Sequence, residues 1–199
     1  LMTTCVIGAT LAKYTTAKDT QDSARVAKWG VRITAATNSA FKTKYNKKDS
    51  STELSVQSST DKVVAPGTSD SAAQFSISGT PEVAVRLSFL MTDVKDVKLT
   101  AGTYKNTDGA TVTLAGDYMP VKFTLNNGST DLATGTLEQI ATFLNSHTLD
   151  YAPGTNLSTT VPTYTLSWAW TFDVSTDADK ADSILGDLAA GESGITKDG

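Results

Sequence analysis

Histidine and cysteine are almost absent from this chain. Its 199 residues contain one histidine, His147, and one cysteine, Cys5. One cysteine cannot form a disulfide within the chain, so a disulfide-stabilised scaffold is excluded. One histidine cannot supply the two histidines, four residues apart with a glutamate between them, that a zinc hydrolase helix requires.

The remaining signals for catalysis are weak. Ser146, His147 and Asp150 have the residue types of a nucleophilic triad, but the chain has no GxSxG motif to present the serine. We expect His147 at the C-terminal end of a helix, where a cation interacts favourably with the helix dipole. Cys5 lies in an apolar run. The sequence therefore predicts a protein without enzymatic activity.

No apolar run is long enough to cross a membrane. The most apolar stretch, residues 1–14, is shorter than the ~20 residues of a spanning helix and contains three threonines. The net charge is -4 and the isoelectric point about 4.9, which argues against nucleic acid as a partner. Lysine and arginine concentrate in the first quarter and aspartate near the end. Two solvated faces, or head-to-tail attraction between copies, would explain this.

Aromatic residues make up only 8% of the chain, and threonine is the most frequent residue. Threonine-rich alternating segments separated by Pro66-Gly67 and Asn127-Gly128 turns are typical of an all-β protein. Two short helices interrupt the pattern, at 136–146, where Thr136 and Gln139 form a capping box, and at 177–190. We expect one jelly-roll-like β-sandwich domain over residues 25–199, with short helical insertions.

Two segments have especially regular alternation. Residues 25–37 place Trp29, Ile33 and other apolar side chains on one side, which predicts a half-buried strand. Residues 164–174 predict a central strand whose aromatic side chains dominate the core. Trp29, Trp168 and Trp170 have the chemistry of a sugar-stacking platform, but packing in the core is the favoured interpretation.

Residues 1–17 form the expected functional element. Cys5, Ile7, Ala9 and Leu11 alternate with smaller or mixed residues, so an extended strand would have one apolar face. We expect this strand to leave its own subunit and complete the sheet of a neighbour, with residues 18–24 as the linker. A first strand folded into its own domain, and a signal peptide ending near Ala12, are the alternatives.

A cation site is a further hypothesis. Four carboxylates lie close together near the C-terminus, and hard cations such as calcium prefer oxygen ligands. Their spacing does not match an EF-hand loop, and capping of a helix start is the favoured interpretation. The four residues are Asp173, Asp177, Asp179 and Asp182.

Several segments resemble the TasA/camelysin family of secreted bacterial biofilm-fibre proteins. The similarity lies in DSARVAKWGV, in APGTSDSAAQFSISGTPEVAVRLSF, and in SWAWTFD followed by DKADSILGD. It spans residues 24–188 as a loose pattern. The resemblance implies a jelly-roll subunit of an extracellular biofilm filament, joined by donor-strand complementation. Camelysins have been classed as metalloproteases, but this chain lacks the zinc-binding histidine pair.

The sequence thus favours a structural subunit of an extracellular or cell-surface filament, a homopolymer in contact with cell-wall or matrix components. No cofactor is expected apart from the hypothetical calcium. The alternative is a monomeric cell-surface adhesin or carbohydrate-binding β-sandwich module whose N-terminal strand folds onto its own domain. Deleting residues 1–11 separates the two, because only a filament subunit would change from polymer to monomer.

Overall fold

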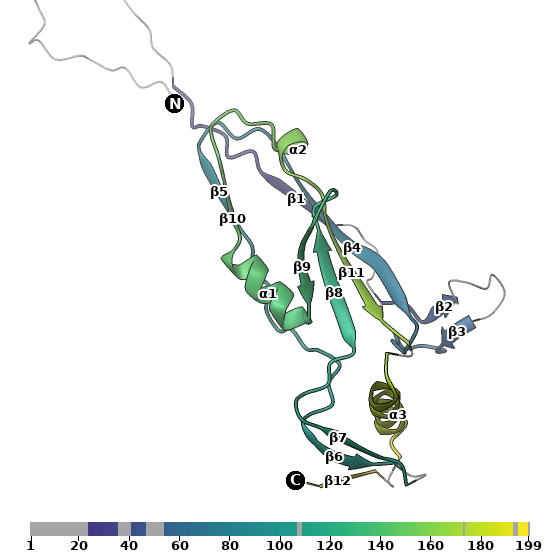
Figure 1. The fold of residues 1–199 in the computed structure, drawn as a ribbon. Helices are drawn as coiled ribbons and strands as arrows, with labels where there is room; N and C mark the ends of the chain where they lie inside the picture. Colours follow the sequence, from purple (N-terminus) through teal and green to yellow (C-terminus); the bar gives the residue numbers. More distant parts are fainter. Residues whose placement is uncertain are drawn as a thin grey trace, which may run out of the picture.

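The chain is predominantly β-sheet with a few short helices (Figure 1). The computed structural model describes residues 24–35, 41–46, 54–106, 109–172, 174–192 and 195–198. Within these ranges no helix is long and apolar enough to cross a membrane. The all-β class predicted from the sequence is confirmed at this level, and the jelly-roll connectivity remains a prediction.

A five-stranded antiparallel sheet forms the main layer. Its order is β1 (Arg32–Ala35), β4 (Ser69–Ser78), β11 (Tyr164–Trp170), β8 (Val121–Asn126) and β9 (Asp131–Gly135). β11 occupies the centre, as its aromatic alternation predicts, and Trp168 and Trp170 are buried. Their burial excludes these two tryptophans from stacking on a sugar.

A second layer covers one face of this sheet. It consists of the antiparallel pair β5 (Val85–Ser88) and β10 (Thr148–Tyr151), together with α1 (Leu137–Ser146). The predicted capping box at the start of α1 is confirmed, since the Thr136 side chain accepts from the Gln139 backbone and the Gln139 side chain accepts from the Thr136 backbone. Ile140, Ala141 and Leu144 bury the apolar side of the helix.

A smaller lobe lies at the end of the molecule away from the start of β1 (Figure 1). It contains a three-stranded sheet with β6 (Gly102–Lys105) between β7 (Thr111–Leu114) and β12 (Thr196–Asp198). The predicted second helix, α3 (Thr176–Ala190), begins at the Ser175 cap and ends at Gly191, whose φ of 76° suits glycine. It packs on the sheet through a separate core that contains Leu99, Tyr104, Val112, Ala181 and Ile184.

Three short elements complete the described part of the chain. β2 (Lys44–Asn46) pairs with β3 (Leu54–Gln57), and α2 (Leu157–Thr160) is a single turn. The β2–β3 pair contributes Tyr45 to the main core, where its ring meets that of Trp168 edge-on at a centroid separation of 5.6 Å.

The half-buried strand predicted over residues 25–37 is wrong in extent and in burial. Only Arg32–Ala35 form a strand within the described residues, and all four side chains are exposed. Trp29 is 73% exposed and Ile33 68% exposed. The reason is position, because β1 is an edge strand and the second layer does not extend over it. The central strand predicted over residues 164–174 is also shorter than expected. Because β11 ends at Trp170, Phe172 and Val174 lie beyond the sheet and are exposed.

Candidate functional site

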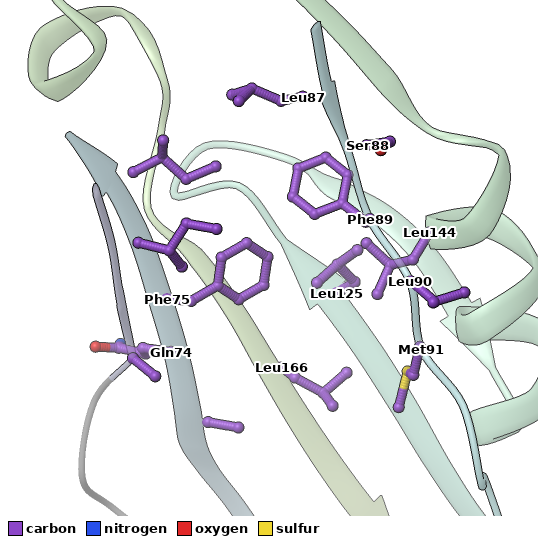
Figure 2. A pocket seen from close by; sticks show the side chains of 14 residues that line it. Gln74, Phe75, Leu87, Ser88, Phe89, Leu90, Met91, Leu125, Leu144 and Leu166 are labelled. Atoms are coloured by element: carbon purple, nitrogen blue, oxygen red, sulfur yellow. The ribbon is translucent and has the colours of Figure 1, made fainter. Parts of the chain in front are cut away.

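An apolar groove of about 500 Å³ lies between β5 and the β1–β4 side of the main sheet (Figure 2). Fourteen residues line it, and all but Gln74 and Ser88 are apolar. A concave surface lined mainly by apolar side chains is a common setting for a binding site. The lining residues are Ile33, Ala35, Ala73, Gln74, Phe75, Ile77, Leu87, Ser88, Phe89, Leu90, Met91, Leu125, Leu144 and Leu166.

Strand register explains the floor of the groove. Ile33 on β1 lies opposite Ile77 on β4, and Ala35 lies opposite Phe75. Directly opposed residues of an antiparallel pair share one face of the sheet, so an apolar surface continues across both strands. It extends over Leu166 of β11, which is opposite Leu125 of β8.

The wall of the groove comes from β5 and the residues that follow it. Leu87 and Phe89 alternate with exposed residues and point towards the floor (Figure 2). The Phe89 ring lies 5.8 Å from the ring of Phe75 and 5.5 Å from that of Tyr164. These aromatic contacts join the two layers. The groove is therefore continuous with the main hydrophobic core.

β5 has an unpaired edge beside this groove. It pairs with β10 on one side only, and no strand among the described residues pairs with its other side. An edge strand presents unpaired N–H and C=O groups, to which another strand can add. The groove therefore combines a backbone edge with an apolar surface for alternate side chains, which are the two requirements for binding an extended segment.

Two rim residues of the groove are exposed to an unusual extent for their type. Leu90 is 82% exposed and Ile33 is 68% exposed. Fully burying such a side chain contributes about 1.5–3 kcal/mol. A strand bound in the groove would therefore be stabilised by burying Leu90 and Ile33 at the edge of the groove as well as the apolar side chains of its floor.

The predicted donor residues Cys5, Ile7, Ala9 and Leu11 lie outside the described residues, as do residues 18–23 of the linker. The described chain begins at Ala24. Immediately after it, Arg25 and Lys28 form hydrogen bonds to the Glu82 carboxylate, an arrangement called the clamp below. Arg25 Nη1 donates to Glu82 Oε2 over 2.6 Å, Arg25 Nη2 donates to Glu82 Oε1, and the Lys28 N–H donates to Glu82 Oε2 over 2.8 Å. The clamp holds residues 25–28 against the segment before β5.

The clamp gives a pH prediction. The Arg25 guanidinium and the Lys28 N–H lower the pKa of Glu82 from 4.5 to about 2. A lowered carboxyl pKa contributes stability that is present above pH 4.5 and is lost as the pH falls towards 2. In a carboxyl-carbon NMR titration we expect Glu82 to titrate near 2 in the native chain and closer to 4.5 in Arg25→Gln. A matched Arg32→Gln variant should leave it near 2, and an unchanged Glu82 in Arg25→Gln would contradict the assignment.

The four-aspartate cation site stays a hypothesis, because only Asp177, Asp179 and Asp182 lie within the described residues. Asp173 lies outside them, and no group of three metal-ligating side chains occurs in the described ranges. Asp177 is exposed and pairs with Lys180 at 3.6 Å in the first turn of α3, as the helix-start interpretation expects.

Asp182 lies instead between the two lobes. It accepts from the Tyr118 hydroxyl over 2.7 Å and from the Trp170 indole N–H over 3.1 Å. Burial raises the pKa of the Asp182 carboxyl, with a further contribution from Asp179, while the two donors oppose the shift. Asp182 thus ties α3 to β11 and to the loop before β8, and this role explains it without a metal.

The triad-like residues have separate roles. His147 caps the C-terminal end of α1, as predicted, and its ring stacks on those of Phe143 and Phe89 at 5.1 and 5.6 Å. Asp150 pairs with Arg86 across β5 and β10 at 2.7 Å, and the Ser146 hydroxyl donates to the Phe143 carbonyl. Each group therefore has a structural partner.

No protein-family model, curated protein or solved structure matches this chain. The comparisons therefore suggest no function, and a functional proposal has to rest on the geometry of the groove. Sequence patterns alone did not locate this groove. The missing signal is tertiary, because an alternating strand looks the same whether its apolar face is covered or open.

Proposed function

We propose that this chain is a structural, non-enzymatic subunit of an extracellular filament that polymerises head to tail by donor-strand complementation. The observation that carries the proposal is the apolar groove beside the edge of β5 that pairs with no strand among the described residues. Residues 1–17 of one copy are the proposed occupant, with Cys5, Ile7, Ala9 and Leu11 facing the groove of the next copy.

The chemistry of donor and groove is complementary. An inserted strand would pair with the backbone of β5 and place every second side chain on an apolar floor. The donor and the groove are different surfaces, so each copy can give a strand and accept one. A head-to-tail contact of this kind propagates as a filament when the rotation between successive copies does not close a ring.

The sequence resemblance to the TasA/camelysin family supports the same proposal of a filament subunit joined by donor-strand complementation. It motivates the extracellular or biofilm-matrix location and the cell-wall or matrix components proposed as partners. The rival proposal is a monomeric surface-binding module in which residues 1–17 cover the groove of their own copy. Both versions fill the groove, so only the assembly state separates them.

Negative-stain electron microscopy of the full-length chain, beside a chain lacking Leu1–Leu11, tests the proposal. We expect filaments from the full-length chain and monomers from the truncated one, because the truncated chain has a groove but no donor. Monodisperse particles from both would favour the monomeric module. Filaments from both would show that another surface drives assembly.

A further inference from the structure

The two ends of the main sheet carry complementary exposed surfaces. β1 begins opposite Ser78, at the end of β4, whereas Ala169 near the end of β11 lies opposite Ser69, at its start. The ten residues of β4 separate these two places by about 30 Å. The segment that leads into β1 and the segment that leaves β11 therefore lie at opposite ends of the sheet (Figure 1).

The head segment, residues 24–32, is apolar and basic. Val26 is 88% exposed and Trp29 73% exposed, and the cations Lys28 and Arg32 are also exposed. Tryptophan is rarely left so open on a folded chain, and tryptophan and arginine are enriched in protein interfaces. The clamp on Glu82 holds this segment in place, which lowers the entropy lost on docking.

The tail hollow, at the other end, has the opposite character. It has a volume of about 380 Å³, and its lining residues Phe172, Asp179 and Asp182 lie just after β11 and on α3. Phe172, 63% exposed, and Pro66 supply an apolar side, while Asp179 and Asp182 supply carboxylates. The remaining lining residue is Ser183.

We infer that the tail hollow of one copy receives the head segment of the next, with Trp29 against Phe172 and Pro66. Lys28 and Arg32 then face Asp179 and Asp182, so the charges as well as the apolar surfaces match. This contact rests on the proposed homopolymer and adds a second interface to the donor strand. The linker 18–24 spans at most about 25 Å, so a donated strand brings the head segment close to the copy that accepts it.

Charge reversal with rescue tests the contact in the full-length chain. We expect Lys28→Glu with Arg32→Glu, and separately Asp179→Lys, to slow polymerisation at low salt by about tenfold or more, measured by light scattering. All three substitutions in one chain should restore part of the rate, because the cation introduced at position 179 then lies opposite the two introduced carboxylates. Lys95→Glu with Lys105→Glu makes the same change of net charge elsewhere and should leave the rate near that of the native chain.

Tryptophan fluorescence gives an independent readout. Trp168 and Trp170 are 2% and 5% exposed, so Trp29 dominates quenching by acrylamide in the monomer. We expect quenching to fall several-fold on assembly, and Trp29→Phe to remove most of that change. A native rate in both reversal variants, or no rescue in the combined chain, would overturn the contact even if Leu1–Leu11 remained essential. If the full-length chain never assembles, both this contact and the filament are wrong.

Discussion

Replacing Ile7 with aspartate is expected to abolish filament formation. In the proposed assembly Ile7 lies in the middle of the donor face and enters a groove lined almost entirely by apolar side chains. Burying an unpaired carboxylate there costs several kcal/mol, more than an inserted side chain can gain. Electron microscopy and sedimentation should find monomers. Thr10→Asp places the same charge on the opposite face of the strand and should still polymerise, so filaments from Ile7→Asp would refute the donor assignment.

The accepting surface has a matching variant. Ile33 is exposed on β1 and lines the groove, so Ile33→Asp should leave the fold intact and block insertion. Thr34→Asp, its neighbour on the other face of β1, is the control. Mixing Ile7→Asp with Ile33→Asp is the sharpest form of this test. The first retains a groove and the second a donor, so the mixture should form dimers and stop there, whereas larger assemblies would contradict the model.

Trp168→Ala is expected to cause the largest loss of stability. Trp168 is 2% exposed on the central strand, and its ring packs 5.3 Å from Phe41 and 5.6 Å from Tyr45. Truncating a buried tryptophan to alanine costs about 3–5 kcal/mol, because it removes apolar burial and leaves a cavity.

Urea unfolding of the monomer measures this effect. The Ile7→Asp background avoids the stabilisation that assembly would add. At a slope of about 2 kcal/mol/M, the midpoint should fall by about 2 M. Phe172→Ala removes another aromatic four residues further along, but from a side chain that is 63% exposed, and should change the free energy of unfolding by less than about 0.5 kcal/mol. Equal effects of the two substitutions would contradict the burial described above.

Local signals in the sequence were sufficient for α1, for α3 and for the central strand, but not for the single turn α2. Thr136 and Gln139 specify the start of α1 because a capping box satisfies the free N–H groups of a helix end through neighbouring residues. The alternation from Tyr164 to Trp170 specifies β11 because large apolar side chains on one face require burial. Both patterns act over a few residues and depend little on the rest of the fold.

The strand predicted over residues 25–37 shows where a local pattern is not sufficient. Residues 25–37 alternate as regularly as β11, yet Trp29 and Ile33 are exposed. Alternation specifies that a strand has an apolar face, but not what covers it. The apolar face of β1 is exposed because β1 is at the edge of the sheet, beyond the part that β5, β10 and α1 cover.

The sequence by itself determined the β class, the helix starts, the buried aromatic strand and the absence of a zinc-binding histidine pair, because each depends on composition or on neighbouring residues. Only the tertiary structure decided that an apolar groove lies beside an edge of β5 left without a partner strand in the described part of the chain, and that Trp29 and the tail hollow lie at opposite ends of the sheet. Those features arise from segments far apart in the chain, such as 33–35, 73–77 and 87–91. Their juxtaposition is set by strand order and layer packing, which no local pattern encodes.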